Sequence, residues 1–472
     1  MSIYQRYFKE NSGQEFPIYA YSPPPQGEWW IDDQVFTTDD FRTVEKYKEY
    51  KDCGFNILFM QRTAAYNGEE WSTCATKRSM ERAVEAGIDK IIIVDERIFD
   101  LSKETDGLIG EGKRFASEEA LDDFIRDCIK EYRHQEGFYG VQLMDEPFHP
   151  RLKAVGQTFK AIRRVDSSIF VHCNLNPVII PHFLYQICPP GMNMIDCYEK
   201  YLTMFLEESG SDYIMMDIYP FYKQAEKAYV SRYYFAGLET VARVCKKYGK
   251  EMHIVVQSFA MNIRNKPYHF MPNEQRMQYQ KNVLISFGVK EFAYFTYWTK
   301  QANSTKGEMF IDGKAMMTRN GEKTPTWYYV QKINRELNEL APLLMQFEYK
   351  ANMYCVTPPL HSNPVYLEMV RGGKLSQVTE AKTDRDVSLV SELYDKKKRQ
   401  YMHCVVNIAD PKRYAKWHKK KKQLTTLTFD KKYAVADVYK NEKWKTVRLK
   451  DGNLELLLSP GEGAIVLPYK EV

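Results

Sequence analysis

The sequence lacks the features that mark exported, membrane-spanning or cysteine-stapled proteins. Its nine cysteines are scattered, odd in number and without a CxxC pair, so they indicate neither a zinc site nor a disulfide framework. No apolar run reaches the length of about 18 residues that a membrane span needs. Residues 1–15, MSIYQRYFKENSGQE, contain no apolar segment of the kind found in signal peptides. These absences predict a cytoplasmic protein without membrane partners.

Excess charge of one sign is also missing. The chain has 67 Lys and Arg against 62 Asp and Glu, a net charge of +5 over 472 residues. This balance does not favour nucleic acid as a partner. Two lysine-rich stretches, 396–399 and 419–422, lie between short apolar runs, where charges commonly protect hairpin turns and edge strands.

Metal and phosphate motifs are absent as well. The histidines show neither HxH nor HExxH spacing, so we expect no metal site. The segment 107–114, GLIGEGKR, has Arg114 where a phosphate-binding loop needs Ser or Thr.

Aromatic residues, in contrast, are abundant. They make up 14% of the chain, with 34 Tyr, 25 Phe and 7 Trp. Aromatic rings serve equally as bulky core residues and as flat surfaces on which sugar rings stack. Composition alone leaves both interpretations open.

One pattern recurs eight times between residues 16 and 300. A short apolar run is followed by an amphipathic helical stretch and a turn, and the runs are 16–22, 55–61, 90–96, 139–146, 169–175, 213–221, 252–259 and 291–298. Continuous apolar runs are typical of parallel strands buried on both faces. Eight such units predict a (β/α)8 TIM barrel. A doubly wound open sheet is the competing fold, but no glycine fingerprint follows the first run.

The pattern changes near residue 345. Short strand-like runs separated by turn residues then follow one another without helices between them. We therefore predict two domains: residues 1–345 as the barrel and residues 346–472 as a smaller antiparallel β-sandwich.

Polar residues gather where the predicted barrel strands end. Because the active site of a TIM barrel lies at the carboxyl ends of its strands, these residues are candidates for the site. In chain order they are Asp95, Glu96, Asp145, Glu146, Asn174, Asp217, Tyr219, Gln257 and Trp298. Acids, amides and aromatics at one mouth suit a polyol ligand, so we expect a carbohydrate substrate.

Glu146 is the best candidate for a general acid. It follows an apolar strand and precedes Pro147, a position where partial burial raises the pKa of a carboxyl group. Glycoside hydrolysis needs one such acid and a second carboxylate.

The order of these units resembles clan A glycoside hydrolases, most closely the catalytic domains of family 42 β-galactosidases. The resemblance is carried by MDEP at 144–147 and FTYW at 295–298 and covers roughly residues 16–340. It implies that Glu146 is the acid/base and that Trp298 forms the floor of the subsite for the cleaved sugar. The tail, LLLSPGEGAIVLPY at 456–469, is similar to the β-sandwich that closes many bacterial glycosidases.

The chain departs from this family on the seventh strand. The family places its nucleophilic Glu there, whereas this sequence has Gln257. An amide cannot act as a carboxylate nucleophile, so either the second catalytic group lies elsewhere or the protein does not hydrolyse by the mechanism of this clan.

Several acids are open for that second role. Asp217 is favoured, because the sixth strand can face Glu146 across the mouth. Asp145 is the second choice, since adjacent Asp and Glu also resemble substrate-assisted hexosaminidases. Asp95 or Glu96 comes third.

These features predict a glycoside hydrolase that acts on a short oligosaccharide or glycoside without a cofactor. Asn174, Tyr219, Gln257 and Trp298, with Asp95 and Glu96, are expected to bind the sugar. A separation of about 5 Å between Glu146 and Asp217 predicts retention, and about 6.5–9.5 Å predicts inversion. The alternatives are a substrate-assisted hexosaminidase-like enzyme and a non-catalytic sugar-binding barrel. A homo-oligomer is compatible with the sequence but not required by it.

Overall fold

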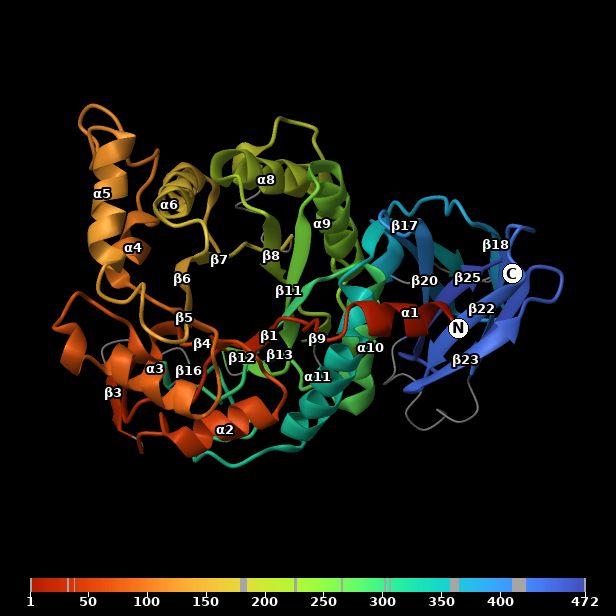
Figure 1. Cartoon of the computed structure of the whole chain (residues 1–472), viewed down its shortest axis with the longest axis horizontal. Coiled ribbons are helices and arrows are strands. Elements are labelled where there is room, and N and C mark those ends of the chain that lie inside the picture. The colour runs from red at the N-terminus through yellow and green to blue at the C-terminus, as the bar shows by residue number, and fades with distance from the viewer. Residues whose placement is uncertain are drawn as a thin grey trace.

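The computed structural model covers most of the chain (Figure 1). It describes residues 2–31, 34–37, 39–178, 185–224, 227–264, 266–300, 303–304, 307–356, 365–409 and 422–470. Residues 419–421 of the second lysine-rich stretch lie outside the described residues.

Each of the eight predicted apolar runs contains one parallel strand. They are β1 (Ile18–Ala20), β4 (Leu58–Phe59), β5 (Ile91–Ile93), β6 (Phe138–Asp145), β7 (Phe170–Asn174), β8 (Tyr213–Asp217), β11 (Glu251–Gln257) and β14 (Glu291–Phe295). They form two four-stranded parallel sheets, with the orders β4-β5-β6-β7 and β1-β14-β11-β8.

Backbone hydrogen bonds connect the two sheets at both of their edges. Ile57 N–H donates to the Ile18 carbonyl oxygen at 3.2 Å, beside β1 and β4. Leu175 N–H donates to the Met215 carbonyl oxygen at 2.8 Å, between the end of β7 and β8. The prediction of a parallel α/β unit is therefore confirmed.

Helices follow the strands as the amphipathic stretches predict. They are α2 (Val44–Asp52), α3 (Ala75–Glu85), α4 (Glu96–Leu101), α5 (Glu118–Ile129), α6 (Leu152–Val165), α8 (Met194–Ser209), α9 (Tyr234–Tyr248), α10 (Glu274–Ser286) and α11 (Pro325–Leu344). Helix α8 shows the local logic. The Asn193 side chain accepts a hydrogen bond from the Asp196 N–H at its start, and Gly210 ends it with φ 67°.

Aromatic side chains fill the space enclosed by the parallel strands. The ring of His172 on β7 stacks on Phe59 of β4 at 4.5 Å and contacts Tyr19 of β1 at 5.8 Å. Tyr213 of β8 stacks on His253 of β11, also at 4.5 Å. A large share of the aromatic content thus belongs to the core.

The C-terminal part consists of antiparallel strands, as predicted. They are β17 (Glu348–Val356), β18 (Val378–Thr383), β19 (Val387–Asp395), β20 (Gln400–Asn407), β21 (Gln423–Phe429), β22 (Val435–Lys440), β23 (Lys443–Arg448), β24 (Asn453–Leu458) and β25 (Gly463–Tyr469). A six-stranded sheet, β17-β19-β20-β25-β22-β23, and a three-stranded sheet, β18-β21-β24, share one hydrophobic cluster. The predicted boundary at residue 345 falls between α11 and β17.

The N-terminal helix α1 (Ile3–Glu10) packs against these C-terminal strands, so both chain ends lie on that side of the molecule (Figure 1). Tyr4 stacks on Trp444 with ring centroids 4.4 Å apart. The Tyr7 hydroxyl donates to Asp395 Oδ2 at 2.7 Å. Residues 3–10 therefore contact the second unit, although sequence alone assigned them to the first.

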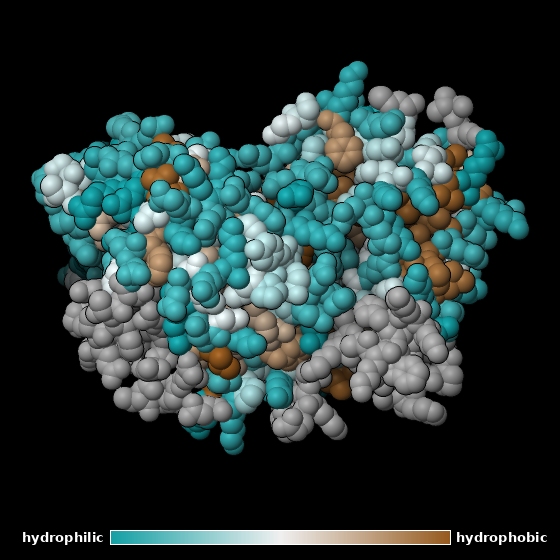
Figure 2. All heavy atoms as spheres, turned by 90° about the horizontal axis from the view of Figure 1, so that it is seen from below, coloured by the Kyte–Doolittle hydropathy of each residue, from teal (hydrophilic) through white to brown (hydrophobic). Residues whose placement is uncertain are grey.

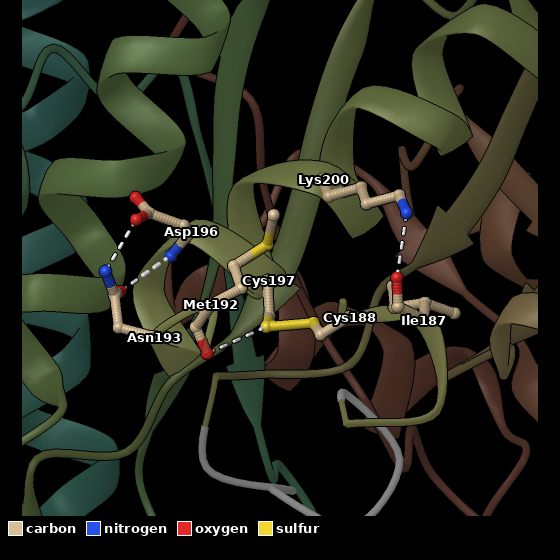
Figure 3. Close-up of a disulfide and its surroundings, with 7 residues drawn as sticks. All are labelled: Ile187, Cys188, Met192, Asn193, Asp196, Cys197 and Lys200. Carbon is tan, nitrogen blue, oxygen red and sulfur yellow. Dashed lines mark hydrogen bonds between the residues drawn. A yellow bond between two sulfur atoms is a disulfide. The ribbon is translucent and has the colours of Figure 1, made fainter. Parts of the chain in front are cut away.

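A disulfide joins Cys188 to Cys197 in the connection between β7 and α8 (Figure 3). The two Cα atoms are 5.6 Å apart. Beside it, Lys200 Nζ donates to the Ile187 carbonyl oxygen at 2.8 Å. The expectation that the cysteines form no disulfide is wrong, because a spacing of nine residues carries no signal until the first turn of α8 brings the two side chains together.

Most of the surface seen in Figure 2 is polar, with a band of hydrophobic residues on the side of the C-terminal sheets. Among the described residues, none of the helices has the length and apolar character that crossing a bilayer requires.

Candidate active site

Three neighbouring strands bring the key polar residues together. Asp145 ends β6 and pairs in register with Asn174, which ends β7. Asp217 ends β8, the next strand around. The carboxyl ends of parallel strands meet at one edge, which we call the mouth.

The carboxyl groups at the mouth are linked by hydrogen bonds. Asn174 Nδ2 donates to Asp145 Oδ1 at 3.0 Å and to Asp217 Oδ1 at 3.4 Å. The carboxyl group of Glu146 lies close enough to Asp217 for the negative charge of Asp217 to act on it.

Burial and like charges raise the pKa of both carboxyl groups. The negative charge of Asp217, followed by burial, raises the pKa of Glu146 well above its usual range. Burial first, and then the charge of Asp145, raise the pKa of Asp217 as well. The pair therefore retains a proton at a pH at which an isolated carboxyl group has lost it.

Aromatic side chains surround these acids. Tyr219, two residues after Asp217, packs against Phe259 at 5.0 Å and Phe295 at 6.1 Å, measured between ring centroids. Tyr21 places its hydroxyl 3.4 Å from His172 Nε2, and its own pKa is raised by burial and by the nearby carboxylates.

Sequence reasoning missed Tyr21, Phe259 and Phe295. Each stands at or just after the end of a parallel strand: β1, β11 and β14 respectively. The same strand-end rule that selected the acids could have selected these rings.

Gln257 was predicted to contact the sugar, but its side chain does not reach the mouth. It is fully buried, and its side-chain oxygen accepts the Phe221 N–H at 3.0 Å. Its side-chain nitrogen donates to the Phe270 carbonyl oxygen at 3.1 Å. The predicted sugar contact is therefore corrected to a structural role: this amide holds the connections that follow β8 and β11.

Trp298 also lies away from the mouth. Strand β14 ends at Phe295, and Trp298 is fully buried, with Nε1 donating to the Arg319 carbonyl oxygen at 3.3 Å. Its ring packs on Phe41 at 4.7 Å. A fully buried ring cannot form the floor of an open subsite, so the half-buried ring of Phe295 takes the strand-end position instead.

Asp95 is likewise structural. It is fully buried, caps α4 and forms an ion pair with Arg97 at 2.7 Å. The Tyr132 hydroxyl donates to the same oxygen, Oδ2, at 3.0 Å, and Arg97 Nε donates to Oδ1 at 3.0 Å. With both oxygens bound by the protein, Asp95 cannot serve as the predicted sugar ligand. Glu96, in the first turn of α4, is half-buried and stays a candidate.

The described residues include no group of three or more His, Cys, Asp or Glu side chains placed to hold a metal ion. His253 instead forms ion pairs with Glu251 and Glu291 at the start of β11 and β14, at the end opposite the mouth.

Comparison with solved structures places this geometry in context. One similar structure is a glycoside hydrolase, with 9% identity, a TM-score of 0.53 and coverage of 97% of this chain and 93% of that one. The two chains share a fold over nearly their whole lengths. A second is a family 5 glycoside hydrolase from Bacteroides vulgatus, with 9% identity, a TM-score of 0.51 and coverage of 96% and 89%.

At such identities the likeness establishes the fold, and it does not single out family 42. No known family description matches the sequence. No curated protein matches it either.

Proposed function

We propose that this protein is a glycoside hydrolase whose parallel sheets close into a (β/α)8 barrel. Glu146 is the general acid and Asp217 the second catalytic carboxylate. The observation that carries the proposal is the pair of Glu146 and Asp217 at the mouth, both held by Asn174, with the pKa of Glu146 raised by the charge of Asp217 and by burial. A protonated acid beside an ionised carboxylate is the pairing that glycosidic cleavage needs.

The proposed substrate is a short oligosaccharide or glycoside whose sugar enters between the two carboxyl groups. Glu146 gives its proton to the glycosidic oxygen as the bond from that oxygen to the anomeric carbon breaks. Asp217 Oδ attacks the anomeric carbon and forms a glycosyl ester. Glu146, now ionised, takes a proton from water, and the water oxygen displaces Asp217 to release the sugar.

Retention of anomeric configuration is the proposed outcome. The charge of Asp217 is the largest influence on the pKa of Glu146, which indicates that the two carboxyl groups lie close together. Close carboxyl groups favour the spacing of about 5–5.5 Å found in retaining enzymes over the inverting spacing of about 6.5–9.5 Å. NMR of the first-formed product anomer tests this point.

The mouth residues Asn174, Tyr219 and Glu96 are proposed to contact the sugar or its flanking group. The half-buried rings of Tyr219 and Phe295 offer an apolar face for a sugar ring.

A second function is favoured by Asp145. It lies beside Glu146 and its position is fixed by Asn174 Nδ2 at 3.0 Å. In a substrate-assisted hydrolase, Asp145 would orient a 2-acetamido group of the substrate, whose carbonyl oxygen would replace Asp217 as the nucleophile.

The test is a panel of α- and β-linked nitrophenyl glycosides that includes 2-acetamido sugars. The protein is assayed beside Glu146→Gln and Asp217→Asn. The matched control is Asp212→Asn. Asp212 is an exposed acid just before the start of β8, at the end of the strand opposite the mouth.

We expect turnover of at least one glycoside, a loss of about a thousandfold or more in both mouth variants, and full activity in the control. Activity restricted to acetamido sugars and retained in Asp217→Asn would replace Asp217 by Asp145. Calorimetric sugar binding without turnover would instead establish a sugar-binding barrel.

A further inference from the structure

One residue of β7, Asn174, contacts all three acidic residues at the mouth. Its backbone oxygen accepts the N–H of Glu146 at 2.8 Å. Its side-chain Nδ2 donates to Asp145 Oδ1 at 3.0 Å and to Asp217 Oδ1 at 3.4 Å. Asn174 itself is buried, with only 4% of its surface exposed.

The backbone contact holds Glu146 in an unusual conformation. Glu146 has φ 50°, in the left-handed region that non-glycine residues rarely adopt. The carbonyl oxygen of the next residue, Pro147, accepts hydrogen bonds from Asn176 Nδ2 at 3.0 Å and from the Tyr201 hydroxyl at 2.7 Å. A strained residue fixed on both sides is a sign of a built site.

The side-chain contacts select charge states. A hydrogen bond from an amide N–H stabilises an ionised carboxylate more than it stabilises a neutral carboxylic acid. Nδ2 therefore favours the anionic forms of Asp145 and Asp217, and this bond lowers the pKa of Asp217 against the effect of burial. Glu146 receives no side-chain N–H from Asn174.

We propose that Asn174 is a positioning residue that keeps Asp145 and Asp217 ionised and thereby confines the proton of the site to Glu146. The proposal rests on the proposed hydrolase function for its kinetic consequence, but the charge assignment itself is a property of the free protein. In this proposal the Asn174 amide does more than bind sugar, because it determines which carboxyl group is the acid and which are ionised.

The other side-chain atom of Asn174 points to a ligand. Oδ1 is buried and has no hydrogen-bond partner among the residues that the structure describes. Because Nδ2 is committed to two carboxylates, the amide cannot turn to exchange its atoms. Oδ1 is therefore the acceptor left for a hydroxyl or amide N–H of the substrate.

The kinetic test compares pH profiles of kcat/KM for the wild type and Asn174→Ala. Loss of the N–H donor raises the pKa of Asp217, so the acid limb of the profile moves up by about one pH unit. The alkaline limb reports loss of the proton from Glu146 beside an Asp217 that is ionised both before and after this step, so that limb stays in place and the profile narrows from its acid side. Asn174→Leu keeps the side-chain volume without the donor and must give the same narrowing, which covers a folding failure of the alanine variant.

Asn176→Ala is the matched control. Asn176 is an equally buried amide two residues further along, and its Nδ2 bonds to the Pro147 carbonyl oxygen instead of a carboxylate. We expect its pH limbs to stay where they are in the wild type, whatever its stability. Unchanged limbs in folded Asn174 variants, or equal shifts in Asn176→Ala, overturn the proposal.

A readout without substrate separates this proposal from the hydrolase function. Infrared difference spectra recorded across a pH titration follow the carboxyl C=O band, and Asp217→Asn identifies the contribution of Asp217. Asn174→Ala should protonate Asp217 at a pH about one unit higher than the wild type does. That shift without any glycosidase activity keeps the charge assignment and rejects the hydrolase, whereas activity without the shift does the reverse.

Discussion

At the scale of single residues, the site depends on like charges held close together. Asp145, Glu146 and Asp217 repel one another, and the bonds from Asn174 to Asp145 and Asp217 offset part of that repulsion. The arrangement keeps a carboxylic acid protonated at neutral pH, which an isolated Glu in water does not achieve.

Asp145→Asn should move the whole activity profile to lower pH. The charge of Asp145 contributes to the raised pKa of both Glu146 and Asp217. Glu146 works protonated, so activity falls as pH rises through its pKa. Asp217 works ionised, so activity falls as pH drops through its pKa. Removing the charge lowers both values, and we expect both limbs of kcat/KM to shift down by about one pH unit.

The shift distinguishes two roles for Asp145. A mere charge neighbour gives a displaced profile of similar height. Near-complete loss of activity at every pH would instead assign Asp145 the substrate-orienting role of the acetamido alternative. Asp212→Asn, at the end of β8 opposite the mouth, serves as the control.

At the scale of elements, close helix packing around the parallel strands depends on Gly156 in α6. A Cβ atom built at this position would lie 2.4 Å from the Glu208 carbonyl oxygen of α8. Backbone atoms cannot yield as a flexible side chain can.

Gly156→Ala should therefore destabilise the protein. In an exposed helix the same change stabilises by roughly 0.5–1 kcal/mol. The sign of the change in the free energy of unfolding is therefore the test. We expect a lower free energy of unfolding by about 1–3 kcal/mol, the usual cost of overpacking, measured by urea denaturation. An unchanged or higher midpoint would contradict the close α6–α8 contact.

The connection between β7 and α8 makes a chemical prediction. Of nine cysteines, seven are free and buried, and Cys188 and Cys197 are joined. Alkylation in urea without reductant should label seven thiols, and prior reduction should raise the number to nine. Mass spectrometry of the peptides should show Cys188 and Cys197 as the pair that is protected, and nine labels before reduction would rule the disulfide out.

At the scale of the whole molecule, the parallel unit and the C-terminal sheets share one hydrophobic core. That cluster runs from the parallel strands through α11 to Leu389 and Met402. At the seam, Lys281 of α10 and Glu336 of α11 form a buried ion pair at 2.6 Å, and the Tyr439 hydroxyl of β22 donates to Glu336 at 3.2 Å.

Glu336→Ala should destabilise the protein as a whole. It leaves Lys281 buried without its partner, and breaking a buried pair in this way costs about 3–5 kcal/mol. We expect one calorimetric transition in the wild type and in the variant, shifted to lower temperature. The double variant Lys281→Met/Glu336→Leu should recover most of the loss, and separate transitions for the two units would show that the seam does not couple them.

The sequence by itself determined the parallel α/β unit, the antiparallel tail and the acids at strand ends. Each apolar run contains its strand because burial on both faces requires local hydrophobicity, which is written in consecutive residues. Asp145, Glu146 and Asp217 were found for a related reason, since a strand of a parallel unit delivers its last polar residue to the mouth.

Only the tertiary structure decided which polar and aromatic residues face that mouth. The run 291–298 continues past Phe295 because Tyr297 packs on Tyr50 and Trp298 packs on Phe41. Hydrophobicity alone therefore could not mark where β14 ends. The carboxylate of Asp95 is bound by Arg97 and Tyr132. The side chain of Gln257 is bound by backbone groups distant in sequence. The pairing of Cys188 with Cys197, and the contact of Asn174 with three acids, likewise arise from contacts between elements, which no local pattern records.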